Sequence, residues 1–298
     1  MNVINSAISQ NIHITTFKTP DYTEFFFSAQ PLKNDTPSSA LNRLAGAARE
    51  RGAQMLALNV FGGLDSGANC GELLRESFGD PMFPVTWIKE RSGTATRIAG
   101  IQAWGITGIQ ALPLIFEGKV LGVYFDAQNM RYCRLGGIIP PDTGATHGEQ
   151  AAQVFQRMDT VLRMCDMHFG QVMRTWFFNH DLLDWYGAFN AARDAFFHQQ
   201  KVYRDIVPAS TGIEGGNPAG AALVADALAV MPRSRDVSVD MVPSPLQCAA
   251  LDYGSSFSRA TEIRAPGMRR LYISGTASVS PDGETQFEGD VAAQIKRT

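Results

Sequence analysis

The residues best suited to chemistry in this chain are a few arginines that lie among aromatic side chains. Arg193 falls within residues 182–199, where apolar residues recur at the spacing of an amphipathic helix. At about 100° per residue, Tyr186, Arg193 and Phe197 lie within ~40° of one another. A guanidinium in an aromatic stripe must reach solvent, pair with an internal carboxylate, or bind an anionic ligand. Arg193 is therefore a candidate carboxylate-binding residue.

Two further arginines also lie close to aromatic residues in the sequence. Arg134 follows Tyr132 by two residues, so the two side chains would share one face of a strand. From the spacing alone, exposure to solvent is the favoured explanation, and ligand binding is the alternative. Arg259, near the end of an aromatic and serine-rich segment, is the third candidate. Three arginines outside any basic run suit a small dicarboxylate better than a polyphosphate.

The elements that must position these arginines belong to an internal repeat. Near residues 140 and 280, an apolar strand ends in a small residue and Gly, a Pro-Asp turn follows, and the sequence reaches G-x-x-A-A-Q. A repeat at this long spacing indicates two related domains rather than a solenoid. Chance similarity is the alternative, because most shared residues are Gly, Ala and Pro.

The first copy shows what such a unit contains. The sequence predicts a hairpin from 112–116 and 120–125, a helix over 151–165, a strand over 172–178 and the helix over 182–199. Residues 219–230 fit either a strand or a helix. We therefore predict an α+β fold, a sheet with helices on one face. The predicted domains are 1–238, with an N-terminal extension, and 239–298, the first half of a second unit.

Composition and charge exclude several classes of protein. The chain has 298 residues, of which 45% are apolar and 18% charged, as expected for a globular protein of about two domains. A net charge of −3 without basic clusters argues against nucleic-acid binding. No apolar run reaches the ~18 residues of a membrane span, and no signal peptide is evident. Four cysteines without a CxxC pair predict reduced thiols and a cytoplasmic location.

The sequence does not match the common catalytic and metal-binding motifs. The chain has no P-loop, no G-x-G-x-x-G after a strand and no G-x-S-x-G elbow. Cys165 and His168 have the spacing of half a metal site, but no second pair follows, so we predict no metal. The residues alone therefore lead to an α+β protein with a pocket for a small anion.

Several longer segments together resemble the chorismatases, two-domain relatives of the RidA/YjgF proteins. The matching segments lie within residues 120–298. They are Arg131-Tyr-Cys-Arg-Leu-Gly-Gly137, Thr175-Trp176, Trp185-Tyr186, Phe189-Asn190 with Arg193, Pro208-Ala-Ser-Thr-Gly-Ile213, Ser244-Pro-Leu-Gln-Cys248, Tyr253-Gly-Ser-Ser-Phe-Ser-Arg259 and Tyr272-Ile-Ser-Gly275. The first hundred residues align only loosely.

This resemblance implies cleavage of the enolpyruvyl ether of chorismate. The products would be pyruvate and either a dihydroxycyclohexadiene carboxylate or a hydroxybenzoate, formed without a metal or organic cofactor. The reaction needs a carboxylic acid of raised pKa to protonate the ether. The expected substrate-binding residues are Tyr132, Arg134, Tyr186, Arg193, Arg259 and Ser274.

In the chorismatases the acid is a glutamate on the last strand of the second domain. That strand lies beyond Thr298, so we expect these 298 residues to be impaired in turnover. The acids within 241–298 are expected on turns or strand ends: Asp252, Glu262, Asp282, Glu284, Glu288 and Asp290.

Two other functions remain open at this point. One is a RidA-like imine or enamine deaminase, and the other is a non-catalytic binder of a small aromatic carboxylate. RidA-like domains usually form trimers with sites between subunits, so a homotrimer is expected by analogy.

Overall fold

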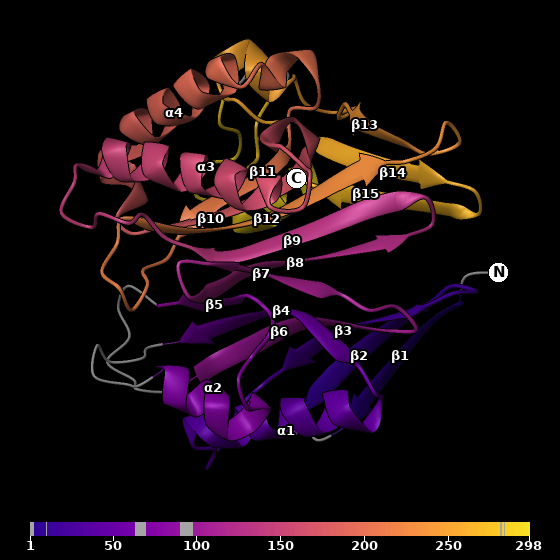
Figure 1. Ribbon diagram of the computed structural model, residues 1–298. Coiled ribbons are helices and arrows are strands. Elements are labelled where there is room, and N and C mark those ends of the chain that lie inside the picture. Colours follow the sequence, from indigo (N-terminus) through magenta and orange to yellow (C-terminus); the bar gives the residue numbers. More distant parts are fainter. Residues whose placement is uncertain (1–2, 10, 63–69, 90–97, 281, 283) are drawn as a thin grey trace.

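The chain is organised around three β-sheets in a computed structural model (Figure 1). The first two sheets lie between two layers of helices, with α1 and α2 on one side and α3 and α4 on the other (Figure 1). The described residues are 3–9, 11–62, 70–89, 98–280, 282 and 284–298.

The first sheet has six strands in the order β1-β2-β3-β6-β4-β5. Two helices, α1 (Pro37–Glu50) and α2 (Cys70–Phe78), pack on its outer face. The Thr36 side chain and Ser39 form a capping box that starts α1. The strands are β1 (Val3–Ser9), β2 (Ile12–Lys18), β3 (Thr23–Ala29), β4 (Gln54–Gly62), β5 (Val85–Ile88) and β6 (Ile98–Thr107). This sheet occupies the range that the sequence left as an N-terminal extension.

The second sheet also has six strands, in the order β11-β10-β12-β9-β8-β7. Two helices, α3 (His147–Arg163) and α4 (Leu182–Gln199), cover one face, and short 3-10 turns flank them at η1 (Phe169–Gln171) and η2 (Val202–Arg204). The strands are β7 (Leu112–Phe116), β8 (Lys119–Ala127), β9 (Met130–Ile138), β10 (Val172–Asn179), β11 (Ala209–Glu214) and β12 (Leu223–Pro232).

Tight turns fix the register of the first three strands of this sheet. Glu117 and Gly118 both have positive φ between β7 and β8, and Gln128 and Asn129 do so between β8 and β9. Positive φ at both central residues is typical of type I′ turns, whose twist matches that of the strands. The chain therefore reverses direction through a two-residue turn at each end of β8.

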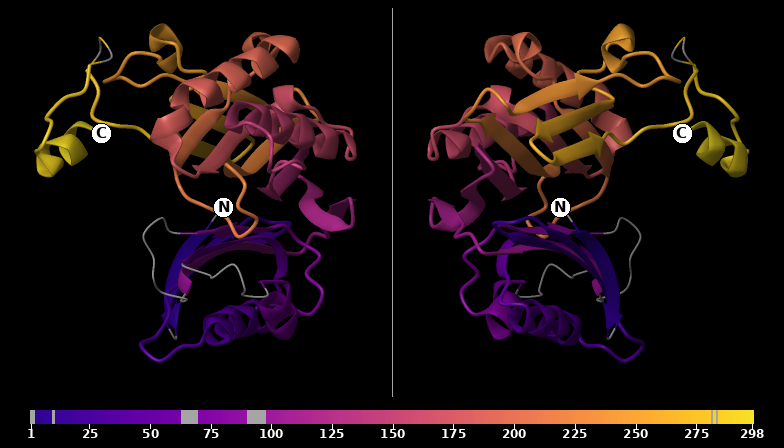
Figure 2. Two further views of the ribbon diagram at one scale, coloured as in Figure 1. Left: turned by 90° about the vertical axis from the view of Figure 1, so that its left-hand side faces the viewer. Right: turned by 90° about the vertical axis from the view of Figure 1, so that its right-hand side faces the viewer.

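The third sheet is smaller, with strands β13 (Ser238–Val242), β14 (Ala260–Ala265) and β15 (Met268–Ile273). A short 3-10 turn, η3 (Ala250–Tyr253), precedes β14, and α5 (Val291–Arg297) follows β15. No side chain of α5 is buried, and Figure 2 shows this helix projecting away from the sheets.

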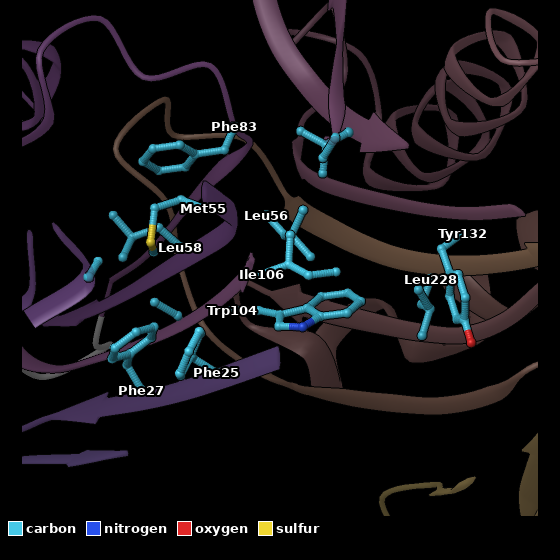
Figure 3. Packing of buried hydrophobic residues seen from close by; sticks show 14 of the residues in the cluster. Phe25, Phe27, Met55, Leu56, Leu58, Phe83, Trp104, Ile106, Tyr132 and Leu228 are labelled. Atoms are coloured by element: carbon cyan, nitrogen blue, oxygen red, sulfur yellow. The ribbon is translucent and has the colours of Figure 1, made fainter. Parts of the chain in front are cut away.

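Side chains from all three sheets meet in one apolar core. Trp104 of the first sheet points toward Tyr132 and Leu228 of the second (Figure 3). Phe125 lies between them, stacked on Tyr132 at 5.0 Å and edge-on to Trp104 at 6.0 Å. Ile263 of β14 belongs to the same cluster. The inner faces of the sheets therefore pack against one another instead of facing solvent.

The observed fold confirms the α+β prediction and resolves its one ambiguity. The predicted hairpin, strand and two helices correspond to β7-β8, β10, α3 and α4, and residues 223–232 form a strand. The proposed domain boundary at residue 238 stays a prediction. None of the helices in the described part of the chain has both the length and the apolar character needed to cross a bilayer.

Candidate functional site

A pocket forms where the second and third sheets meet, and we call it the arginine pocket. Its volume is about 350 Å³, within the usual range for small-molecule sites. Helix α4, strand β11 and the segments on either side of the β14-β15 hairpin supply its walls. The lining residues are Leu182, Tyr186, Phe189, Arg193, Ser210, Thr211, Gly212, Ile213, Phe257, Arg259, Gly275, Thr276, Ala277 and Val279.

The two arginines of this pocket come from elements far apart in sequence. Arg193 is 4% exposed, lies over the Phe189 ring at 5.3 Å and donates from Nη2 to Asn190 Oδ1 at 2.7 Å. Arg259 is 7% exposed and donates from Nε to the Cys248 carbonyl oxygen at 2.9 Å. Tyr186, which is half exposed, lies in the same wall. Three of the six predicted site residues are therefore brought together.

Ser274 lies just behind the pocket and joins its two sides. Its Oγ accepts a hydrogen bond from the Ser210 N–H at 2.8 Å and donates to the Ser258 carbonyl oxygen at 2.5 Å. Ser274 is 5% exposed and is not part of the wall. In this structure its hydroxyl ties β15 to β11, which places the lining residues beside it.

A second polar contact holds the segment of Arg259 against α4. The Ser256 hydroxyl donates to the Asp194 carboxylate, and the Tyr203 hydroxyl lies 2.5 Å from Ser256 Oγ. Asp194 is the next residue after Arg193 on α4, and Ser256 is three residues before Arg259. This network therefore fixes the two arginine-bearing segments relative to each other.

Tyr132 and Arg134 occupy a different part of the molecule. The two share one face of β9, as their spacing predicted, and this face points toward the first sheet. Tyr132 is 1% exposed, and burial raises the pKa of its phenol well above the usual value. Arg134 lines a separate cavity of about 220 Å³ between the sheets. The structure does not bring these two residues into the arginine pocket.

The charge of Arg134 is engaged by a buried carboxylate that the sequence analysis missed. Asp226, fully buried on β12, accepts from Arg134 Nη2 at 2.7 Å and from Asn59 Nδ2 at 2.8 Å. It also accepts from Thr86 Oγ at 2.5 Å and from the Gly137 N–H at 3.2 Å. A lone aspartate in the otherwise apolar stretch 219–230 was the signal that could have found it.

Arg174 is a second buried arginine that the sequence analysis did not single out. It is 6% exposed on β10, and its guanidinium lies 4.7 Å from the Trp176 ring centre. Burial, together with the positive charge of Arg134, lowers the pKa of Arg174 to about 10. Among the described residues, no carboxylate forms an ion pair with it. Its positive charge lies directly behind the wall of the arginine pocket, because Arg174 Nη2 donates to Thr211 Oγ.

No acidic residue lines the arginine pocket within the described ranges. The expectation that the acids of the third sheet lie on turns or strand ends is wrong for Glu262. Glu262 lies within β14, is 5% exposed and forms ion pairs with Arg264 and Arg269. These two guanidinium groups keep the pKa of its carboxyl low, so Glu262 is a poor proton donor.

One group of potential metal ligands is present at the surface: His180, Asp181 and Glu214 have ligand atoms within 4.8 Å of one another. Glu214, however, accepts from the backbone N–H groups of Asp181 and Leu182, at 3.0 and 3.1 Å. Negative charge at these N–H groups stabilises the start of α4. The cluster thus has a structural explanation without a metal.

Comparison with known proteins identifies the fold. No protein-family model matches the sequence, and no curated protein matches it either. The crystal structure of a chorismatase aligns with 92% of this chain and 74% of its own, at a TM-score of 0.55 and 17% identity. The YjgF gene product of E. coli aligns with 40% of this chain and 91% of its own, at a TM-score of 0.33 and 25% identity. This chain therefore has the α+β fold of chorismatase, as the resemblance of its motifs predicted.

Proposed function

We propose that the chain binds chorismate, or a closely similar dicarboxylate, in the arginine pocket and supplies the substrate-binding residues for chorismatase-type cleavage of its enolpyruvyl ether. The products of such cleavage would be pyruvate and a dihydroxycyclohexadiene carboxylate or a hydroxybenzoate. The observation that best supports this proposal is the meeting of two buried arginines, Arg193 and Arg259, in one small pocket of a protein with the chorismatase fold.

The composition of the pocket suits such a ligand. Chorismate has two carboxylates, and a guanidinium can donate two parallel hydrogen bonds to each. The rings of Phe189, Phe257 and Tyr186 offer apolar surface for the cyclohexadiene ring. Because the arginines are buried, each charge-assisted hydrogen bond forms in a medium of low dielectric constant and gains strength.

Cleavage also needs a proton for the enol ether carbon, and the described lining residues include no acid that could supply it. We therefore assign binding and orientation of the substrate to these residues. Tyr132 and Arg134, which the resemblance implied as binding residues, lie between the sheets and are assigned no contact with this ligand.

Isothermal titration of the protein with chorismate tests the binding step. We expect Arg193→Gln and Arg259→Gln each to weaken binding by about 10-fold or more, because a hydrogen bond to a charged group contributes about 1.5–3 kcal/mol. Arg157→Gln is a matched control, since Arg157 pairs with Glu117 far from the pocket, and we expect it to bind chorismate like the parent protein. Equal affinities in all four proteins would refute the proposed site.

A coupled assay for pyruvate tests the cleavage step on the same samples. Since the described pocket wall contains no acid, we expect chorismate to bind without release of pyruvate. Release of pyruvate would show that another acid reaches the ether.

A second candidate function is the binding of a carboxylate without turnover. The absence of an acidic residue among the described lining residues of the pocket favours it. Binding of benzoate with no binding of chorismate would support it. Release of ammonia from an enamine substrate would instead identify the deaminase. Trimer formation and a cytoplasmic location stay predictions, and light scattering measures the first.

A further inference from the structure

A further pocket, which we call the β5 pocket, lies along β5, an edge strand of the first sheet. Its volume is about 610 Å³, compared with about 350 Å³ for the arginine pocket. Helix α2 supplies one part of its wall, and strands β8 and β9 of the second sheet supply another. In the described part of the chain the two pockets share no lining residue, so the β5 pocket is a separate site.

The two pockets occupy equivalent places in the two large sheets. The strand order β7-β8-β9-β12-β10-β11 appears in the second sheet and β11-first reading aside repeats the order β1-β2-β3-β6-β4-β5 of the first. In each sheet the edge strand runs parallel to its neighbour and follows a helix, α2 before β5 and α4 before β11. A glycine also packs closely against each edge strand, because an added Cβ would lie 2.4 Å from the Val85 carbonyl oxygen at Gly137 and 3.0 Å from Thr211 at Gly275. The fold therefore builds the same kind of junction twice, and the β5 pocket is the counterpart of the arginine pocket.

The wall of the β5 pocket is mainly apolar. Its apolar side chains come from α2, from both large sheets and from the segments beside them: Leu74, Phe83, Trp87, Leu121, Ile139 and Val224. Asn217 also lines the pocket, but its amide already pairs with the Ala221 backbone at 2.9 and 3.1 Å. Such a wall favours a ligand with a large apolar body, and the rings of Phe83 and Trp87 favour an aromatic one.

The charges of the pocket are positive and lie where it meets solvent. Arg75 and Lys119 both line the pocket and are exposed. Arg75 follows Gly71 by four residues, and Gly71 lines the pocket too, so Arg75 lies on the face of α2 that borders it. Among the described lining residues none is acidic, and within the described ranges neither cation forms an ion pair. A cleft lined by charges of one sign attracts ligands of the opposite sign.

We infer that the β5 pocket binds an aromatic carboxylate, with its rings against Phe83 and Trp87 and its carboxylate at Arg75 and Lys119. This inference does not rest on the proposed function, because the β5 pocket and the arginine pocket have different walls. The larger volume of the β5 pocket suits two fused rings, so naphthoate is the probe and naphthamide is its neutral analogue.

Alkylation by N-ethylmaleimide, followed by mass spectrometry of each thiol, measures occupancy of the pocket. Cys70 lines the β5 pocket, whereas Cys248 is also half-buried but lies outside it and serves as the internal reference. We expect naphthoate to slow the alkylation of Cys70 and not that of Cys248. Naphthamide should need an about 5-fold higher concentration for half protection, because it lacks the charge that the two cations attract.

Substitution of the two cations tests their role, and both are exposed, so the fold should tolerate their loss. In the double variant Arg75→Gln and Lys119→Gln, half protection of Cys70 should need about 5-fold more naphthoate and an unchanged concentration of naphthamide. Lys18→Gln is the control, because Lys18 is exposed on β2 and does not line the pocket, and it should behave like the parent. Each variant is compared with itself in the absence of ligand, which removes any change in the intrinsic reactivity of the thiol.

Several results would overturn the inference. These are no protection of Cys70 by naphthoate, equal protection of Cys70 and Cys248, or equal potency of naphthoate and naphthamide. An unchanged naphthoate concentration in the double variant, or an equal change in Lys18→Gln, would refute the role of Arg75 and Lys119.

Discussion

Replacing Asp226 by Asn should strongly destabilise the protein, although it changes neither the size nor the shape of the side chain. Asp226 is fully buried and accepts hydrogen bonds from residues of both large sheets. The substitution removes the negative charge opposite Arg134, which is 7% exposed. It also places an N–H₂ group where the structure supplies donors only.

The size of the effect follows from the burial of the pair. Removing one partner of a buried ion pair costs about 3–5 kcal/mol, because the remaining charge is left in a medium of low dielectric constant. The amide oxygen of Asn can still accept two of the four hydrogen bonds. We therefore expect the free energy of unfolding to fall by about 3 kcal/mol, at the lower end of that range.

Urea denaturation of the parent and the variant measures this difference. Asp126→Asn is the matched control, because Asp126 pairs with Arg131 at 2.9 Å but has a side chain that is 48% exposed. Exposed ion pairs contribute about 0–1 kcal/mol, so the control should change little. Equal losses in the two variants, or a loss below about 1 kcal/mol for Asp226→Asn, would refute the reasoning.

Three further predictions concern the packing of the sheets. Glu24→Gln should lower the free energy of unfolding by about 3 kcal/mol in urea denaturation, because Arg270 donates to this buried carboxylate at 2.7 and 3.1 Å. Gly137→Ala should cost about 2 kcal/mol or more by the same measurement, since Gly137 has φ +64° and a Cβ would lie 2.4 Å from the Val85 carbonyl oxygen. Gly212→Ala is its control, because the φ of Gly212 is ordinary and the atom nearest to an added Cβ, Asn179 Nδ2, is 3.9 Å away. Above pH 10 the unfolded chain loses phenolic protons that the folded chain retains, so stability should fall as the pH rises further. Phenolate absorbance should then rise together with unfolding in an alkaline titration, and a rise before unfolding would contradict the burial. The tyrosines whose pKa burial raises in this way are Tyr22, Tyr132 and Tyr272.

Local patterns in the sequence were enough to predict most elements of the second sheet. Apolar spacing and turn residues act within a few residues of one another, and they predicted α4 and the β7-β8 hairpin. Strand alternation also placed Tyr132 and Arg134 on one face. Residues 219–230 stayed ambiguous, because a short run buried on both faces shows no period.

The candidate site depended on contacts that local patterns do not encode. Periodicity shows which face of an element is apolar or polar, but not which other element covers that face. Arg134 could equally have faced solvent, a ligand or another sheet, and its partner Asp226 lies 92 residues away in the sequence. Likewise, the sequence identified Arg193 and Arg259 separately, and the fold placed them in one pocket.

The sequence by itself determined the α+β class, the helices and hairpins of the second sheet, and three arginines suited to carboxylates. Only the tertiary structure decided which of these arginines share a pocket, and that Asp226 pairs with Arg134 between the sheets. The physical reason is that a buried charge or hydroxyl takes its role from the donors and acceptors around it. Here those groups come from distant strands that meet only when the three sheets pack.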